Sequence, residues 1–191
     1  MGEVIEVKDL SFSYEQELIL KDINLEISEG DFVAFIGPNG SGKSTLLKLM
    51  LGLIKPNQGE IRLFGKRIDK FNDWTKIGYI SQEVRGFNES FPATVKEVIA
   101  ANLYNEMGFF KLLTSDLEKK VDQVLELVDM LDYKNKQIGN LSGGQKQKIF
   151  IARTLVTNPA IIFLDEPLVG VDKDSQQEFY KLLAQLNSDL D

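Results

Sequence analysis

One glycine-rich segment constrains the fold of this chain more than any other, Gly37-Pro38-Asn39-Gly40-Ser41-Gly42-Lys43-Ser44. Residues 31–36 before it are apolar on both faces, which is typical of a buried central strand. Residues 43–53 after it carry leucine and methionine at helical spacing. A buried strand, a glycine loop and a helix in this order are typical of α/β proteins. We therefore expect an α/β fold with a parallel core sheet.

The chemistry of this loop is that of a phosphate site. Its residues fit the pattern G-x-x-x-x-G-K-[ST], in which glycines let backbone N–H groups converge on phosphate oxygens beside a positive helix N-terminus. Lys43 would reach the β and γ phosphates, and Ser44 would ligate Mg²⁺. The residues expected to bind nucleotide here are Gly37, Pro38, Asn39, Gly40, Ser41, Gly42, Lys43, Ser44 and Thr45.

Two acidic residues follow a second apolar run. Residues 160–164 are expected to form a buried strand, and Asp165 and Glu166 come at its carboxyl end, the edge at which parallel sheets bind their ligands. We expect Asp165 at the Mg²⁺ site and Glu166 as the general base that polarises water toward the γ phosphate. Such a pair alone is commonplace at a turn, and only the glycine loop gives it catalytic meaning.

A third motif lies at 141–145. Ser142 and Gln145 have the spacing of a capping box, so the segment is expected to begin a helix. Gly143 and Gly144 would occupy its first turn, where glycine is unfavourable for helix stability. Bare glycine N–H groups at a helix start favour a second anion-binding site, formed by Ser142, Gly143, Gly144 and Gln145.

Together these motifs resemble those of the ATP-binding-cassette (ABC) ATPases, over essentially the whole chain. Residues 141–145 match the family signature letter for letter, between matching phosphate-loop and acidic-strand motifs. The resemblance implies ATP and Mg²⁺ as ligands and a head-to-tail dimer in which the signature of one copy closes on the γ phosphate held by the other. It further implies that Tyr14 stacks on adenine, that Gln82 senses Mg²⁺ and the attacking water, and that Asp172 crosses the dimer interface.

The resemblance also implies the domain organisation. We expect residues 1–191 to form one cassette, a P-loop NTPase fold with an antiparallel β portion near the N-terminus and an inserted helical subdomain at 86–145. The family pattern ends in a further strand with a histidine that contacts the γ phosphate, and this sequence contains no histidine. We interpret the chain as truncated before that residue, which leaves hydrolysis by this polypeptide in doubt.

The remaining secondary structure follows from local patterns. Capping boxes predict helices that begin at Thr94 and at Ser115, the latter with Val121, Val124 and Leu125 along one face. The strands expected besides those above are 4–7, 10–14, 23–27, 60–64 and 77–81, and a final helix is expected after residue 172.

Composition excludes several alternatives. Without cysteine or histidine, the chain cannot use a Ser-His-Asp triad, histidine-bound zinc or a thiolate. A net charge of −7 with no basic cluster argues against a nucleic-acid partner. The acidic start is unlike a secretory signal, and no apolar run could span a bilayer. These features predict a soluble, cytosolic protein, and the resemblance to ABC ATPases implies that a permease holds it at the cytoplasmic face of the membrane.

Residues 73–82 and 91–98 look most like the ATPase subunits of zinc and manganese uptake transporters. An apolar surface around Phe87, Phe91, Phe109 and Phe110 would then be the dock for the transmembrane partner. Two alternatives remain open. One is a soluble ABC ATPase of DNA repair or translation, although the coiled coils, second cassette or basic linkers of such proteins are not seen. The other is a fragment that binds nucleotide without hydrolysing it.

Overall fold

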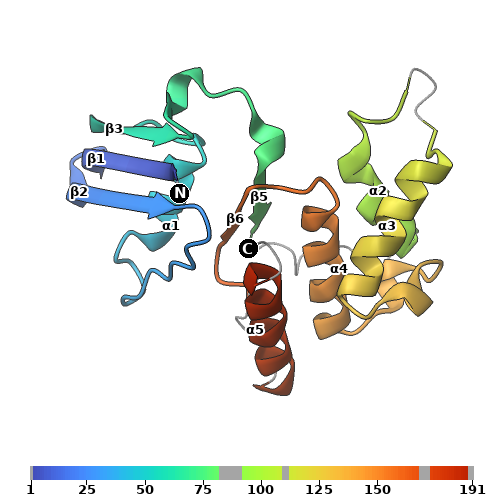
Figure 1. The fold of residues 1–191 in the computed structure, drawn as a ribbon. Helices are drawn as coiled ribbons and strands as arrows, with labels where there is room; N and C mark the ends of the chain where they lie inside the picture. Colours follow the sequence, from blue (N-terminus) through green and yellow to red (C-terminus); the bar gives the residue numbers. More distant parts are fainter. Residues whose placement is uncertain (1, 82–91, 109–111, 168–172, 189–191) are drawn as a thin grey trace. The chain divides into compact units, whose positions relative to one another are not determined.

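The computed structural model describes residues 2–81, 92–108, 112–167 and 173–188 (Figure 1). The chain divides into two compact units, the first formed by residues up to Trp74 and the second by Thr75–Leu186. Each unit is described by itself below. Expected residues Gln82, Phe87, Phe91, Phe109, Phe110 and Asp172 lie outside the described part of the chain.

The first unit is built on an antiparallel sheet, as the sequence predicts. Its strand order is β2-β1-β3-β4, with β1 Glu3–Tyr14, β2 Glu17–Ser28, β3 Gln58–Leu63 and β4 Lys66–Arg67. The two short strands expected at 4–7 and 10–14 are one continuous strand, β1. Its pairing with β2 shifts register between Val7 and Leu10, and Asp9 between them has a φ of 48°. This irregularity in the strand explains why the alternating pattern breaks there.

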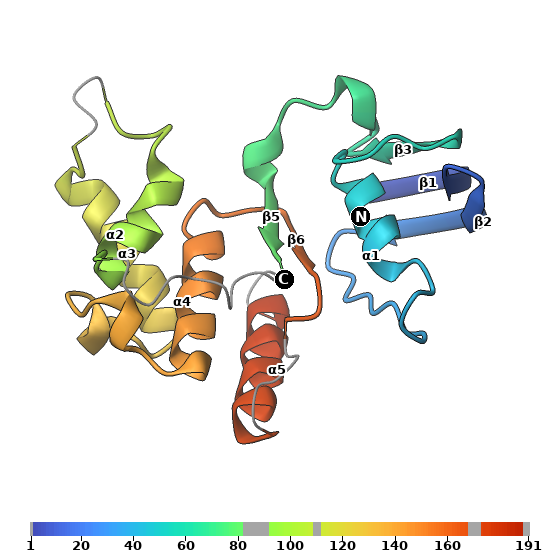
Figure 2. The same ribbon diagram turned by 180° about the vertical axis from the view of Figure 1, so that it is seen from behind.

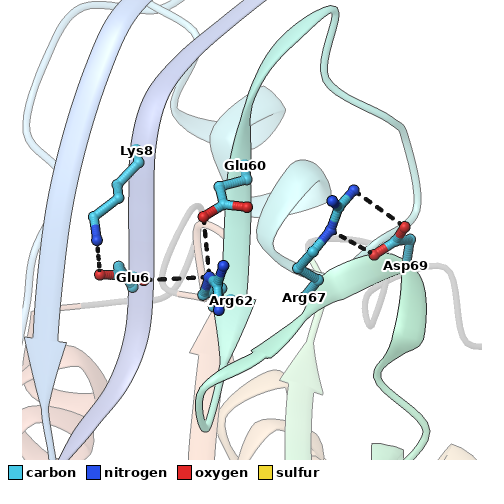
Figure 3. Close-up of polar contacts among 6 residues, drawn as sticks. All are labelled: Glu6, Lys8, Glu60, Arg62, Arg67 and Asp69. Carbon is cyan, nitrogen blue, oxygen red and sulfur yellow. Dashed lines mark hydrogen bonds and ion pairs between the residues drawn. The ribbon is translucent and has the colours of Figure 1, made fainter.

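The two faces of this sheet differ sharply in chemistry. Ile5, Val7, Ile61 and Leu63 are almost fully buried on one face. On the opposite face the register places Glu6 opposite Arg62 and Lys8 opposite Glu60, so that opposite charges face each other across the strands (Figure 3). This alternation fixes which side of the sheet packs against the core.

Ion pairs join these charged residues into a short row. Arg62 Nε lies 3.0 Å from Glu60 Oε1 and 3.6 Å from Glu6 Oε2, and Lys8 pairs with the same Glu6 (Figure 3). The hydrogen bond from Arg62 lowers the pKa of Glu60, and the hydrogen bond to Glu6 raises the pKa of Lys8. A separate pair, Arg67 with Asp69, closes the turn beyond β4.

The first helix, α1 Lys43–Met50, follows the glycine loop as expected and buries Leu46, Leu47, Leu49 and Met50. The strand expected at 31–36 is not found, so this prediction is wrong. The side chains of Phe32 and Ile36 are 61% and 95% exposed. The four strands described in the first unit pair only with one another, which leaves 31–36 without a partner to complete a ladder.

The second unit contains the parallel sheet. Strands β5 Ile77–Ile80 and β6 Ile161–Leu164 pair in parallel, from Ile77 opposite Ile161 to Ile80 opposite Leu164. The α-helices described in this unit are α2 Val95–Ala100, α3 Ser115–Leu127, α4 Gly143–Leu155 and α5 Lys173–Ser188. Short 3₁₀ helices lie in this unit at η4 Ala101–Leu103, η5 Leu131–Tyr133 and η6 Ile138–Asn140, whereas η1 Ile68–Lys70 belongs to the first unit and η2 Trp74–Lys76 spans the boundary.

Hydrogen-bonded caps begin α2 and α3. Thr94 and Glu97 form a complete capping box at α2, and the hydrogen bonds from Thr94 lower the pKa of Glu97. For α3 the expected cap, Ser115, is wrong. Thr114 is the N-cap, because its hydroxyl accepts a hydrogen bond from the backbone N–H of Leu117 at 3.4 Å, and Ser115 is the first helical residue. Thr114, directly before the expected cap, carries an equivalent hydroxyl, so the helix begins one residue earlier than expected.

Helices α2, α3 and α4 lie side by side (Figures 1 and 2), and their buried side chains form one hydrophobic core. Val95, Ile99, Val121, Leu125 and Ile149 are fully buried in it. At its rim Lys134 Nζ lies 2.7 Å from Asp122 Oδ1 and 3.0 Å from Glu118 Oε1. The bond to Asp122 raises the pKa of Lys134, and the bond from Lys134 lowers that of Glu118.

Two glycines of the first unit allow a matched test of the β1–β3 contact. Gly59 and Gly65 both have positive φ, 81° and 73°, but a Cβ at Gly59 would lie 2.4 Å from the backbone oxygen of Lys8, whereas at Gly65 it would meet nothing within 4 Å. We expect Gly65→Ala to lower the free energy of unfolding by roughly 1–2 kcal/mol through backbone strain alone. Gly59→Ala should lower it by about 2–5 kcal/mol, because a steric collision adds to that strain.

Urea unfolding followed by the fluorescence of the single tryptophan, Trp74, measures both losses. Equal losses for the two variants would contradict the close approach of the two strands at Gly59.

Candidate functional site

The glycine loop at 37–44 has the backbone that its sequence predicts. Gly40 and Gly42 have φ values of 84° and 87°, a region that L side chains rarely adopt. A Cβ at Gly42 would also lie 2.8 Å from Leu20 Cδ2 and 3.1 Å from Ile19 Cγ2, so the loop packs directly on β2. At Gly40 an added Cβ would meet nothing within 4 Å. The loop therefore packs against β2 at Gly42, whereas the space beside Gly40 is open.

Lys43 places its charge inside this loop. Its Nζ donates hydrogen bonds to the backbone oxygens of Gly37 and Pro38, both at 2.9 Å. An ammonium group has three N–H donors, and these two bonds use two of them. The N-cap of α1 is Gly42, which offers no side-chain cap, and the first turn contains no acidic residue. A cation at an uncapped helix start fits an anion such as a triphosphate.

Tyr14 lies on the hairpin that supports the loop. It is the last residue of β1, pairs with Glu17, and has a side chain that is 45% exposed. Its ring contacts Phe12 edge-on, with the ring centroids 4.8 Å apart. The loop contacts the same hairpin at Ile19 and Leu20, a few residues farther along β2. Tyr14 is thus a partly exposed aromatic residue on the strand pair on which the loop rests.

The two acidic residues of the second unit follow β6 directly. The backbone N–H of Asp165 donates to the oxygen of Ile80 at 3.0 Å, which extends the β5–β6 pairing by one residue. The Asp165 side chain is buried, with 9% of its surface exposed. Glu166 has a φ of 48° and turns the chain out of the strand. Both carboxylates therefore lie at the carboxyl edge of the parallel pair, where the sequence predicts them.

The signature segment begins α4 as predicted. Ser142 is the N-cap, and its hydroxyl accepts from the N–H of Gln145 at 3.3 Å, while Gln145 Oε1 accepts from the N–H of Ser142 at 3.0 Å. The capping box is complete, and no side chain lies within 4 Å of the position a Cβ would take at Gly143. A cavity of about 280 Å³ opens beside this start, between Ser142, Gln145, Tyr133 and Phe179.

One polar residue of α4 was missed by the sequence reasoning. Gln147 is 9% exposed, and its Nε2 donates a hydrogen bond to the backbone oxygen of Pro167. The signal was available in the sequence, because Gln147 lies three and four residues before the buried Phe150 and Ile151. A polar side chain on an apolar helix face indicates a specific partner.

The predicted residues are thus distributed over both units. Tyr14 and the phosphate loop, from Gly37 to Thr45, belong to the first unit. Asp165, Glu166 and the signature residues belong to the second, where Gln147 of the signature helix bonds the segment after Glu166. Within the described residues, no helix has both the length and the apolar character needed to cross a membrane.

Comparison with known proteins gives the same family over nearly the whole chain. Residues 20–169 match the family profile described as ABC transporter. The chain is 50% identical over 187 residues to the zinc uptake system ATP-binding protein ZurA of Listeria innocua, which covers 98% of this chain and 73% of that protein. It is 38% identical to the manganese transport system ATP-binding protein MntB of Bacillus subtilis, covering 95% of this chain and 72% of that protein.

The fold matches as well. The structure of cbiO1 from Clostridium perfringens, part of the ABC transporter complex cbiONQ, superposes with a TM-score of 0.85 at 31% identity, covering 100% of this chain and 76% of that chain. The matched region contains the phosphate loop, the signature and the acidic pair in their expected order. This chain belongs to the ABC transporter family, and its fold is that of an ATP-binding cassette.

Proposed function

We propose that this chain is the ATP-binding and ATP-hydrolysing subunit of a transporter that takes up a metal ion, zinc or manganese. The nucleotide assignment rests on the position of the Lys43 ammonium. It lies inside a loop in which Gly40 and Gly42 have left-handed φ values, at a helix start without a side-chain cap. Family membership implies ATP binding. The choice of the transported metal rests on the relatives. The zinc uptake protein is 50% identical to this chain and the manganese transport protein 38%, so we propose zinc first.

The roles of the residues follow their chemistry. Lys43 offsets the charge of the β and γ phosphates, and the loop N–H groups hold their oxygens. Tyr14 stacks on adenine, and we assign Ser44, Asp165 and Gln82 to Mg²⁺, a cation that uses few protein ligands beside phosphate oxygens and water. Glu166 takes a proton from the attacking water as the bond from the γ phosphorus to ADP breaks.

The assembly is also part of the proposal. Residues 1–191 act as one cassette with a helical subdomain at 86–145, and two copies pair head to tail so that the signature residues 142–145 of one meet the nucleotide of the other. A permease holds the pair at the cytoplasmic face of the membrane. Two alternatives remain: a soluble ABC ATPase, and a chain that binds nucleotide without hydrolysing it.

The first prediction tests the nucleotide site. Lys43→Ala should abolish Mg-ATP binding, because it removes the positive charge that faces the phosphates. Lys48→Ala is the matched control, since Lys48 is an exposed residue in the last turn of the same helix. Titration calorimetry with Mg-ATP compares the three proteins. Equal affinity in the wild type and the Lys43→Ala protein would mean that the loop is not the phosphate site.

The second prediction tests the base. Glu166→Gln keeps the size of the side chain but cannot accept the proton of water at neutral pH, so the hydrolysis rate should fall by ~10² or more while ATP is still bound. Glu126→Gln, an exposed change near the end of α3, should leave the rate unaltered. The measurement is the rate of phosphate release by the wild type and the two variants, each as the full-length protein. An undiminished rate in Glu166→Gln would move the base elsewhere.

The third prediction tests transport. The full-length subunit should copurify with a polytopic membrane protein and, reconstituted with it in vesicles, should drive uptake of radioactive Zn²⁺ in an ATP-dependent manner. Mn²⁺ should compete weakly. A subunit that hydrolyses ATP but associates with no membrane protein would favour the soluble ATPase. Uptake of Mn²⁺ in preference to Zn²⁺ would reverse the choice of metal.

A further inference from the structure

The side chain of Gln147 connects two parts of the second unit that the motifs treat as separate. It projects from the second turn of α4, five residues after the capping residue Ser142, and its Nε2 donates to the oxygen of Pro167. Its side chain is buried, and a buried amide without a partner would be costly. The hydrogen bond is therefore a specific feature of how α4 packs against the segment after β6.

That segment contains Glu166 between two fixed points. Before it, the N–H of Asp165 is bonded to the oxygen of Ile80 at 3.0 Å. After it, the oxygen of Pro167 accepts from Gln147, and the proline ring restricts its own φ. Glu166 itself has a φ of 48°, a conformation that an L residue holds only when its surroundings enforce it. Gln147 supplies the restraint on the carboxyl-terminal side.

We propose that Gln147 is a positioning residue for the hydrolytic reaction: its hydrogen bond to Pro167 fixes the backbone at Glu166 and thereby aims the carboxylate at the attacking water. This inference rests on the proposed function, in which Glu166 is the general base. Because catalysis depends steeply on the placement of the base, loss of this restraint should act on turnover and leave nucleotide binding at the phosphate loop unchanged.

The test is a double-mutant cycle in the full-length protein. Gln147→Met keeps the length of the side chain and removes the donor. Gln147→Leu also has no donor and brings no charge into the buried position, so it serves if the methionine variant does not fold. Thr154→Val is the matched control, since Thr154 is buried on the same helix and its hydroxyl donates to the Phe150 oxygen one turn earlier, at 2.9 Å.

Phosphate release as a function of ATP concentration gives kcat and KM for each variant. We expect Gln147→Met to lower kcat on the order of 10- to 100-fold with KM for ATP unchanged. Thr154→Val should leave kcat within a factor of about two, as expected for a change that does not reach the site. In the Glu166→Gln background Gln147→Met should produce no further loss, because a residue that acts through Glu166 has nothing left to position.

Three results would overturn the inference while leaving the proposed base intact: an unchanged kcat in Gln147→Met, an equal loss in Thr154→Val, or a full additional loss in the double variant. A fourth result, a wild-type rate in Glu166→Gln, would instead remove the base role itself and the inference with it. The two kinds of failure are therefore separate in the same set of measurements.

Discussion

The second unit depends on the way α4 is fixed along its whole length. Its start is closed by the reciprocal bonds of Ser142 and Gln145, and its second turn is tied to Pro167 through Gln147. Near its end Arg153 Nε donates to Asn102 Oδ1 at 2.9 Å, while Asn102 Nδ2 donates to the Arg153 oxygen at 2.8 Å. Burial lowers the pKa of the Arg153 guanidinium. A helix held at three points can present its glycine-rich start rigidly, which is what recognition of a phosphate by backbone N–H groups requires.

In the first unit the β1–β2 hairpin holds the phosphate loop in place, as the contacts of α4 hold the signature segment in the second. The phosphate loop has left-handed glycines that would be mobile in isolation, but Gly42 is pressed against Ile19 and Leu20 of β2. The hairpin in turn is anchored by its buried face and by the charged row on the opposite face. The conformational freedom that lets the loop curve around an anion is thereby restricted to the positions that need it.

Local features could be predicted from the sequence, because their cause lies within a few residues. The capping boxes at Thr94 and Ser142, the glycine loop and the β5–β6 strands all follow from short patterns, and the resemblance to ABC ATPases added the fold. Features that depend on distant partners could not. Residues 31–36 have the composition of a central strand, yet composition does not supply the neighbouring strand that a ladder needs. The Gln147–Pro167 bond spans twenty residues, so neither motif alone reveals it.

The distribution of acidic residues separates the helices that meet nucleotide in the proposed function from those that only support the fold. The chain has 29 acidic residues against 22 basic ones, so a helix start without acid is notable. Helix α2 carries Glu97 in its first turn, and α3 carries Asp116 and Glu118, where their charges favour the helix dipole. Helices α1 and α4 have no acidic residue there, although one would stabilise them for the same reason. That stabilisation is absent at the two helix starts assigned to phosphate, because a carboxylate at either would repel the ligand that the positive end attracts.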